Sequence, residues 1–385
     1  MKVVIAIDSL KGSLTSMEAG RAIEKGIFNV NPSAEIIVKP LADGGEGTTE
    51  ALIEGLGGEK INIEVCGPLR EKVNAQYGIL TETKTAIIEI AAAAGIILIK
   101  EEERNPLKAT TYGVGEMIKD AIRRGCRDFI IGIGGSATND GGIGMLSALG
   151  YEFTDASGNR LVFGGGELQR VEHISSSNVI PELKQCNFIV ACDVTNPLYG
   201  ENGATFIYGP QKGVTNDYKV DLDKAMANYA TVTKKYVGND FADALGAGAA
   251  GGLGFAFLSY LKADLKSGIN LVLDAVKLED CIKDADYVVT GEGCLDYQTS
   301  LGKAPVGIAK MAKKNGAIVI ALAGSILEGA ESCNANGIDS YFSILNKVIT
   351  LKEAMKKETA ESNMIRTTEQ IFRLVNSVEK RQSKS

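Results

Sequence analysis

Residues 131–150 constrain the fold of this chain more than any other stretch. They read IGIGGSATNDGGIGMLSALG, with glycine pairs, small hydroxyls, an amide and a carboxylate between an apolar run at 129–131 and a helical pattern at 145–149. This order predicts a buried strand, then a polar turn, then a helix. Glycine lets a ligand approach the backbone, and a helix N-terminus favours an anion. The stretch therefore predicts a phosphate or carboxylate site; the alternative is a tight turn that needs glycine only for its geometry.

Length and composition limit the class of protein. A chain of 385 residues is longer than one typical core supports, so we expect two domains. There are 41 basic and 48 acidic residues, a net charge of −7, and no basic stripe, which argues against nucleic acid as a partner. The apolar run at residues 3–7 is too short for a signal peptide or a membrane span. We therefore expect a cytoplasmic protein with no membrane partner.

His173 is the only histidine, and it stands in a polar stretch where we expect a surface position. A Ser-His-Asp hydrolase would have a single candidate base, and a histidine-rich zinc site would lack ligands. Chemistry in this chain must therefore fall to carboxylates, lysines, hydroxyls and backbone N–H groups. Such groups suit positioning and charge neutralisation.

The opening of the chain repeats one pattern twice. An apolar run at residues 3–7 leads into the polar loop DSLKGS and then a helix capped by Thr15 or Ser16. A second run at residues 36–38 leads into ADGGEGT and a helix that starts near Thr49. Two such units predict a doubly wound parallel sheet, whose ligands lie at the carboxyl ends of the strands.

The middle of the chain differs from both ends. From about Ile61 short alternating segments favour a mixed or antiparallel sheet. After Asp284 the strand, polar-loop, helix pattern returns. The sequence therefore predicts an α/β protein of two domains: a Rossmann-like parallel-sheet domain from residues 1–67 and 284–385, interrupted by an inserted mixed α/β domain at residues 68–283.

A glycine-rich run at residues 246–251 matches G-x-G-x-x-G letter for letter. No strand precedes it and no βαβ unit surrounds it, which argues against a dinucleotide site. Close packing of a glycine-rich helix start, or contact with a nucleotide phosphate, explains the run better. The P-loop pattern G-x-x-x-x-G-K-[ST] is missing from the sequence.

Five polar loops each follow an apolar strand: DSLKGS, ADGGEG, GGSATNDGG, CDVTNPL and GEGCLDYQT. Each contains a carboxylate, and the first contains a lysine. Phosphoryl transfer needs backbone N–H groups for phosphates, a lysine for charge, and carboxylates for Mg²⁺ and for orienting a hydroxyl. Together the loops favour this chemistry.

These loops, in this order and together with GPQKG at residues 209–213 and the glycine-rich run at 246–254, resemble the type I glycerate kinase family over nearly the whole chain. The resemblance implies an ATP- and Mg²⁺-dependent kinase that makes phosphoglycerate from D-glycerate, usually 2-phosphoglycerate. It also implies two α/β domains, one flavodoxin-like and split by the other, with the active site in the cleft between them. Leu10 stands where the family often has phenylalanine, and Cys294 where a basic residue is common.

Residue type and loop position suggest individual roles. Asp193 would accept the proton of the glycerate hydroxyl, unless it only caps a turn. Lys11 would neutralise the transferred phosphate, unless it is a solvated lysine at a helix start. Glu292 and Asp296 would hold Mg²⁺, unless they only cap the following helix. The remaining candidates for contacts with substrate or ATP are Asp8, Ser9, Gly12, Ser13, Asp43, Gly44, Gly45, Glu46, Ser136, Thr138, Asn139 and Asp140.

Several alternatives stay open at this point. The product could be 3-phosphoglycerate, or the substrate another small hydroxy acid. A nicotinamide-dependent oxidoreductase would use residues 246–251, and a non-catalytic binding protein would use the glycine-rich loops alone. The oligomeric state is undecided, and a homodimer is one option.

Overall fold

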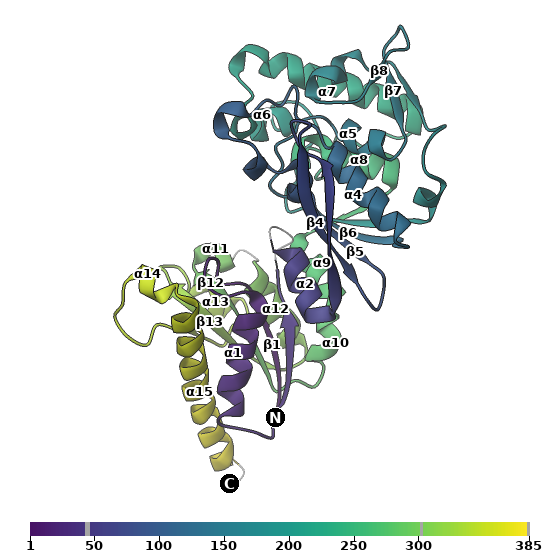
Figure 1. Cartoon of the computed structure of the whole chain (residues 1–385). Helices are drawn as coiled ribbons and strands as arrows, with labels where there is room; N and C mark the ends of the chain where they lie inside the picture. Colours follow the sequence, from purple (N-terminus) through teal and green to yellow (C-terminus); the bar gives the residue numbers. More distant parts are fainter. Residues whose placement is uncertain (43–46, 301–302, 383–385) are drawn as a thin grey trace. The chain divides into compact units, whose positions relative to one another are not determined.

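The computed structural model describes residues 1–42, 47–300 and 303–382. The chain divides into two compact units (Figure 1). Unit 1 comprises Met1–Asp43, Glu54–Leu56 and Val272–Ser385, and unit 2 comprises Gly44–Ile53 and Gly57–Leu271. Unit 1 thus draws on both ends of the chain and unit 2 on its middle.

Unit 1 is built on a five-stranded parallel sheet. Its strands are β1 (Lys2–Ile7), β2 (Glu35–Pro40), β12 (Tyr287–Leu295), β13 (Ile318–Ile326) and β14 (Ser340–Ser343). Their spatial order is β14-β13-β12-β1-β2, and every neighbouring pair is parallel. Counted along unit 1 alone, this is the order 2-1-3-4-5 that flavodoxin-like sheets have. The expected α/β class with a parallel sheet is therefore confirmed.

Of the helices of unit 1, α1 (Ser16–Phe28) and α12 (Ala304–Lys314) contact the strands of this sheet directly. Helix α1 starts at a capping box, in which Thr15 and Glu18 each accept the backbone N–H of the other. Thr15, rather than Ser16, is thus the cap. The other helices are α10 (Leu278–Ile282), α11 (Tyr297–Ser300), α13 (Ser332–Ala335), α14 (Leu351–Ala354) and α15 (Lys357–Gln382).

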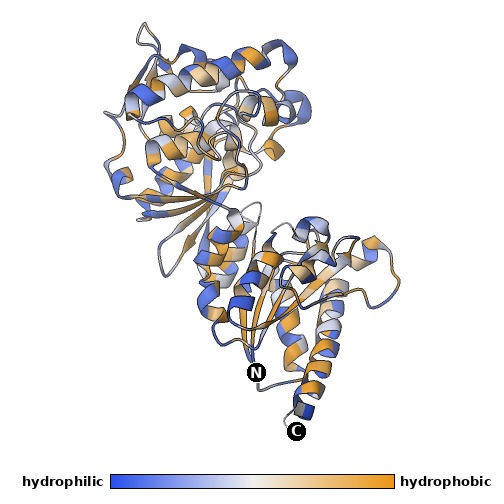
Figure 2. Ribbon diagram, turned by 180° about the vertical axis from the view of Figure 1, so that it is seen from behind, coloured by the Kyte–Doolittle hydropathy of each residue, from blue (hydrophilic) through white to orange (hydrophobic). Residues whose placement is uncertain are grey.

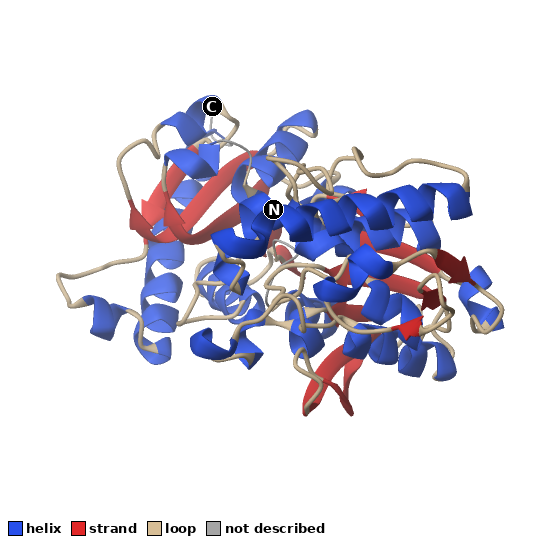
Figure 3. Ribbon diagram, turned by 90° about the horizontal axis from the view of Figure 1, so that it is seen from above, coloured by secondary structure: helices blue, strands red, loops and turns tan. Residues whose placement is uncertain are grey.

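The core of unit 1 follows the alternation of its strands. Val3, Ile5 and Ile7 of β1 are fully buried in one cluster with α1 and with Met364 and Phe372 of α15. Right-handed crossovers bring α1 and α12 to opposite faces of the sheet. Figure 3 shows helices on both sides of the strands, and Figure 2 shows the strands as the most apolar part.

Unit 2 contains a six-stranded mixed sheet. Its strands are β3 (Gly58–Cys66), β4 (Lys72–Leu80), β5 (Ala86–Glu89), β6 (Asp128–Gly132), β10 (Asn187–Ala191) and β11 (Asp264–Lys266). The order is β11-β10-β6-β5-β4-β3; β3, β4 and β5 pair antiparallel, and β5, β6, β10 and β11 pair parallel. The mixed sheet expected from residue 61 onward is thus confirmed.

Helices and a small second sheet complete unit 2. The small sheet is formed by β7 (Glu152–Thr154), β8 (Arg160–Leu161) and β9 (His173–Ser175). The α-helices are α2 (Thr48–Leu56), α3 (Ala91–Ala94), α4 (Tyr112–Arg123), α5 (Ile143–Ala148), α6 (Ala204–Tyr208), α7 (Asn216–Val237) and α8 (Ala249–Leu261). The 3₁₀ helices are η1 (Ile96–Leu98), η2 (Glu101–Glu103), η3 (Gly165–Arg170), η4 (Pro181–Gln185) and η5 (Pro210–Lys212). Helix α9 (Gly268–Ala275) spans the boundary between the two units, and so does α2, whose last three residues, Glu54–Leu56, belong to unit 1.

Two further expectations from the sequence concern the position of the single histidine and the presence of membrane-spanning helices. His173 lies exposed on β9, as expected, and the structure assigns it no role in a site. Within residues 1–42, 47–300 and 303–382, none of the helices is both long and apolar enough for a membrane crossing.

Candidate active site

The sheet of unit 1 reverses its strand order between β1 and β12, and polar residues follow both strands there. Asp8 comes directly after β1, and its N–H donates to the carbonyl oxygen of Gly291 in β12 at 2.9 Å. Gly291 has a φ of +150°, and a Cβ on it would lie 1.8 Å from the carbonyl oxygen of Leu322. Only glycine fits that position. The next residue, Glu292, is thereby placed beside the loop that begins at Asp8, at the type of switch point where parallel α/β sheets bind ligands.

The loop after β1 is a tight turn that presents Lys11. The N–H of Leu10 donates to the carbonyl oxygen of Leu14 at 2.9 Å, and the N–H of Ser13 donates to that of Leu10 at 2.8 Å. Lys11 is exposed. Leu10, by contrast, is buried and belongs to the hydrophobic core of unit 1, so its role is packing. The Ser13 hydroxyl is shielded from solvent and has no hydrogen-bond partner within the part of the chain that the structure describes. Ser9 N–H donates to the Asp8 carboxylate at 2.7 Å.

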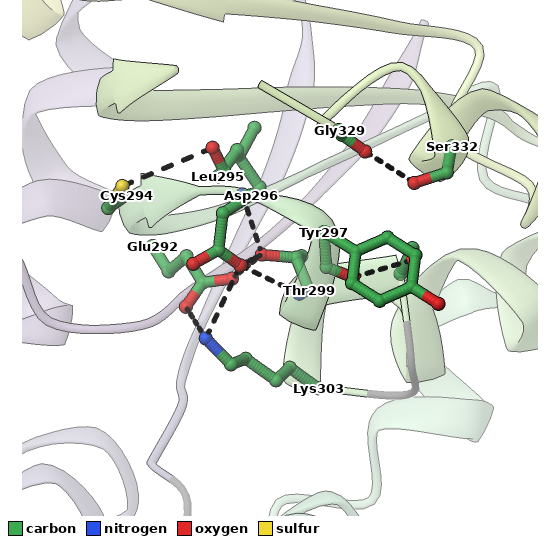
Figure 4. A network of polar contacts seen from close by, with 10 residues as sticks. Glu292, Cys294, Leu295, Asp296, Tyr297, Thr299, Lys303, Gly329 and Ser332 are labelled. Atoms are coloured by element: carbon green, nitrogen blue, oxygen red, sulfur yellow. Dashed lines mark hydrogen bonds and ion pairs between the residues drawn. The ribbon is translucent and has the colours of Figure 1, made fainter. Parts of the chain in front are cut away.

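Glu292 and Asp296 form a pair of neighbouring carboxylates (Figure 4). The Thr299 hydroxyl donates to Glu292 Oε1 at 2.7 Å, and the Thr299 N–H donates to Asp296 Oδ1 at 3.0 Å. Lys303 Nζ lies 3.9 Å from Glu292 Oε2 and 3.7 Å from Asp296 Oδ1. Asp296 therefore does cap α11, and it also stands beside a second carboxylate that faces the same cation.

The electrostatics of this pair differ between its two members. Burial raises the pKa of Glu292, against the lowering effects of the Thr299 hydrogen bond and of the nearby Lys303 charge. For Asp296 burial acts in the same direction, but the Thr299 N–H and the Lys303 ammonium outweigh it and lower the pKa of this carboxyl. Glu292 thus takes up a proton at a higher pH than an ordinary glutamate, and Asp296 takes one up only at a lower pH than an ordinary aspartate.

The donor set of this pair fits Mg²⁺. Mg²⁺ sites of nucleotide-using enzymes commonly take one or two carboxylates and complete the shell with phosphate oxygens and water. Glu292 and Asp296 supply two carboxylates that already share a cation, Lys303. Among the described residues no group of three or more His, Cys, Asp or Glu is placed to hold a metal.

In unit 2 the carboxyl ends of four adjacent parallel strands meet at one edge. The loops after β6 and β10 are therefore neighbours, because β6 and β10 pair directly. Asp193 follows β10 and is exposed. Its Oδ1 accepts the N–H of Gly268, the first residue of α9, at 3.0 Å. Asp193 therefore contacts the start of α9, rather than only the turn before Pro197.

The loop after β6 is anchored by a buried lysine. Lys212 of η5 is 2% exposed, and its Nζ donates to Ser136 Oγ and to the carbonyl oxygen of Thr138, each at 2.7 Å. Burial lowers the pKa of Lys212 to about 7, and the charge of nearby Asp140 partly opposes this shift. The pattern GPQKG at residues 209–213 gives no local sign that its lysine is buried.

Asp140 and Asn139 of the same loop point into unit 2. Asp140 Oδ2 accepts the N–H and the hydroxyl of Thr111 at 2.8 and 2.9 Å, and its Oδ1 accepts the N–H of Gly142 at 3.1 Å. Asn139 Nδ2 donates to the Thr205 hydroxyl at 3.0 Å. Both residues are fully buried, so in this structure they brace the loop. Thr138 Oγ1 and Asn139 Oδ1 are buried atoms without a hydrogen-bond partner among the described residues.

The glycine-rich run at 246–251 packs directly on this loop. Gly251 has a φ of +69°, and a Cβ there would lie 2.0 Å from the carbonyl oxygen of Thr138. The N–H of Gly141 donates to the carbonyl oxygen of Gly251 at 3.0 Å. Close packing against another loop, rather than a dinucleotide, thus accounts for these glycines.

The candidates Asp43, Gly44, Gly45 and Glu46 lie outside the described residues. Beside this segment, the Glu89 carboxylate accepts the N–H of Gly47 at 3.3 Å and that of Thr49 at 2.8 Å, at the start of α2. The sequence pattern did not predict a role for Glu89. The available signal was a single glutamate near the end of the apolar segment 85–90. The same is true of Lys303, whose short separation from Glu292 and Asp296 was visible in the sequence.

The structure gathers the described candidates into one group per unit. Unit 1 brings together the turn at residues 8–13, the carboxylates at 292 and 296, and Lys303. Unit 2 brings together the loop after β6, the loop after β10, and Lys212. Polar, glycine-rich loops with a lysine and carboxylates at the carboxyl ends of parallel strands define an α/β protein suited to phosphate chemistry.

Comparisons with known proteins give the family. The glycerate kinase family matches this chain over residues 3–376. The chain is 49% identical to a glycerate 2-kinase of Escherichia coli K12 over 92% of this chain and 93% of the relative. It is 47% identical to a glycerate kinase of Bacillus subtilis 168, covering 96% and 97%. A crystal structure from Salmonella typhimurium LT2, designated glycerate kinase 2, matches with a TM-score of 0.91 and 43% identity over 99% of both chains. The chain belongs to the glycerate kinase family and is an enzyme, a kinase.

Proposed function

We propose that this enzyme transfers the γ-phosphoryl group of ATP to the 2-hydroxyl of D-glycerate, with Mg²⁺, to give 2-phosphoglycerate and ADP. The observation that carries the proposal is identity of 49%, over nearly the full length of both chains, to a protein named glycerate 2-kinase. The polar loops and their lysines and carboxylates support the same chemistry, since phosphoryl transfer depends on positioning and on neutralising charge.

In the proposed reaction Asp193 is the general base. Its carboxylate would take the proton of the substrate hydroxyl as that oxygen forms a bond to the γ-phosphorus and the bond from phosphorus to the ADP oxygen breaks. Exposure supports this role, because a ligand can reach a carboxylate that is not enclosed. Its hydrogen bond to Gly268 N–H at 3.0 Å orients one oxygen.

Unit 1 would act on the phosphate groups. Lys11, exposed on its tight turn, would neutralise charge on the transferred group, and Ser9, Gly12 and Ser13 would donate hydrogen bonds. Mg²⁺ held by Glu292 and Asp296 would offset the charge of the phosphates. The Lys303 ammonium lies near both carboxylates, so it would have to move away when the ion binds, or turn toward a phosphate oxygen.

We also propose that the two units are separate domains and that unit 2 is an insertion in unit 1. The flavodoxin-like strand order supports this proposal, since it is complete only when strands from both ends of the chain are combined. We further propose a cytoplasmic enzyme, because ATP is its phosphoryl donor.

The test is ³¹P NMR of the product formed from D-glycerate and Mg²⁺-ATP. A phosphate ester at C2 couples to one proton and gives a doublet, whereas an ester at C3 couples to two and gives a triplet. We expect the doublet, and no transfer when Mg²⁺ is removed. A triplet would revise the product to 3-phosphoglycerate. Folded enzyme that leaves D-glycerate unmodified but phosphorylates another hydroxy acid would contradict the proposed substrate.

A further inference from the structure

Among the residues that the structure describes, the buried cation Lys212 has no role in the reaction described above. A lysine is rarely 2% exposed unless its charge is paired or strongly hydrogen-bonded. Its two hydrogen bonds, to Ser136 Oγ and to the Thr138 carbonyl oxygen, both end on the loop after β6. Asp140, the titratable group that acts on Lys212, already accepts hydrogen bonds from Thr111 and Gly142. The lysine is therefore placed to act on the loop.

The contact with Lys212 determines which way the Ser136 hydroxyl points. An ammonium group only donates, so while Lys212 is protonated Ser136 Oγ is the acceptor in this 2.7 Å contact. The hydrogen of that hydroxyl is then directed elsewhere. Across residues 1–42, 47–300 and 303–382, the hydroxyl makes no second hydrogen bond that would use it. The Ser136 hydroxyl therefore has a hydrogen available to donate, and it would bind a group that accepts a hydrogen bond.

The backbone on both sides of Ser136 is fixed as well. Gly135 carbonyl oxygen accepts the N–H of Ile96 at 2.8 Å, and the N–H of Ala137 donates to the Ala94 carbonyl oxygen at 2.8 Å. The end of α3 and the residues that follow it therefore hold the backbone of the loop, while Lys212 holds the Ser136 side chain. Ser136 itself is 7% exposed, so a small part of it reaches the surface of unit 2.

We propose that Lys212 is a positioning residue that orients the Ser136 hydroxyl to donate its hydrogen to an anionic oxygen of a bound substrate. That oxygen belongs either to the carboxylate of D-glycerate or to a phosphate of ATP. The inference rests on the proposed function and extends it, because it names the group through which a buried lysine acts. While Lys212 is protonated, an anion at Ser136 also gains from the positive charge behind the hydroxyl, since charge-assisted networks are stronger than neutral ones.

The test measures the binding of each substrate separately by isothermal titration calorimetry. D-glycerate and the non-hydrolysable β,γ-imido analogue of ATP with Mg²⁺ are titrated into wild-type enzyme, Ser136→Ala, Lys212→Met and the double variant. Ser136→Thr keeps the hydroxyl, and Ser259→Ala is the matched control. Ser259 is 8% exposed, belongs to the same unit, and lies on α8.

We expect Ser136→Ala and Lys212→Met each to weaken one of the two ligands by roughly 10- to 100-fold, the effect of losing a hydrogen bond to a charged group. The ligand that weakens identifies the source of the anionic oxygen. The double variant should be no weaker than the worse single variant, because Lys212 acts through Ser136. Ser136→Thr should restore most of the affinity, and Ser259→Ala should bind like the wild type.

The positioning role is overturned if Ser136→Ala binds both ligands like the wild type, or if the effects of the two single variants add in full. Should Lys212→Met fail to fold, the comparison of Ser136→Ala with Ser136→Thr still decides, because equal losses in both would contradict a role for the hydroxyl. Failure of the proposed function looks different: the wild-type enzyme would then not phosphorylate D-glycerate, while its affinity for the ATP analogue could still be compared among the variants.

Discussion

At the scale of single residues, Asp193 makes a hydrogen bond to the start of α9 and carries a negative charge, and the hydrogen bond does not depend on the charge. Its Oδ1 accepts the N–H of Gly268, and an asparagine oxygen could accept the same hydrogen bond. The negative charge, by contrast, is what a general base needs. A change to asparagine therefore keeps this hydrogen bond and removes the charge.

Asp193→Asn should leave the fold intact and lower kcat by about 10²- to 10⁴-fold, because proton transfer from the substrate loses its acceptor. Steady-state kinetics with D-glycerate and ATP, and a thermal melt of the same sample, measure both effects. The matched control is Asp240→Asn, since Asp240 is also exposed and accepts the N–H of Ala242 at 3.1 Å. Near-normal kcat in Asp193→Asn would remove the base assignment.

Lys212 should make stability depend on pH. Its folded pKa of about 7 lies below the ordinary value of 10.5, so between these two pH values the unfolded chain binds more protons at this site than the folded chain. The free energy of unfolding therefore rises as pH increases from 7 toward 10.5, and the full cost of the buried charge is present below pH 7. Over this window the gain is on the order of a few kcal/mol.

Urea unfolding at pH 6.5 and at pH 9 measures this dependence in wild-type enzyme and in Lys212→Met. The variant should show a smaller rise in the free energy of unfolding between the two pH values. Lys235→Met, a change at an exposed lysine of α7, should keep the rise of the wild type. An unchanged rise in Lys212→Met would show that Lys212 does not titrate in this range.

At the scale of elements, two loops of unit 2 depend on each other. The loop after β6 contacts the start of α8, where Ala250, Gly251 and Gly252 all have positive φ. Gly251 leaves no room for a side chain against Thr138. The glycine-rich run therefore sets the position of the loop that carries Ser136.

Gly251→Ala should destabilise the enzyme by about 3 to 5 kcal/mol, from a left-handed backbone that disfavours alanine and from overpacking. It should also weaken binding of whichever substrate the loop after β6 contacts. Gly238→Ala is the control, since Gly238 has a φ of +82° and open space around it, so only the backbone cost of about 1 kcal/mol applies. Equal losses of stability in the two variants, seen in thermal melts, would contradict the packing argument.

At the scale of the whole molecule, each unit has a hydrophobic core of its own. The cluster of unit 2 extends from β3 to α8, and that of unit 1 contains β1, β12 and β13 with α1 and α15. Val190 in β10 and Val289 in β12 are buried equivalents in the two clusters. Separate cores favour separate unfolding steps.

Differential scanning calorimetry should therefore show two transitions. Val190→Ala and Val289→Ala each remove about 2 kcal/mol of packing and should each lower a different transition by roughly 5 °C. A single transition that both variants lower equally would show that the two cores unfold as one.

The sequence predicted those features that depend on local pattern. Apolar runs at 3–7 and 129–131 marked β1 and β6, and Thr15 or Ser16 as a cap marked the start of α1, because a strand or a cap needs residues close in the chain. The order of motifs also identified the family. The paired residues of β1 and β12, such as Val3 and Tyr287, are 284 positions apart, and only the return of the opening pattern indicated that these strands belong to one sheet.

Contacts between distant residues were decided by the tertiary structure. The residues next to Lys212 in the sequence do not indicate that it contacts Ser136, 76 positions away. Those next to Glu89 likewise do not indicate its hydrogen bond to the start of α2. The same holds for Asp140, whose acidic side chain suggested a ligand contact but which the fold turns toward Thr111. By itself the sequence determined the elements, the family and the kinds of groups available for catalysis, because these follow from neighbours along the chain. Which of those groups are buried, paired or left to meet a ligand was settled by packing, because burial and hydrogen-bond partners come from residues that only the folded chain brings together.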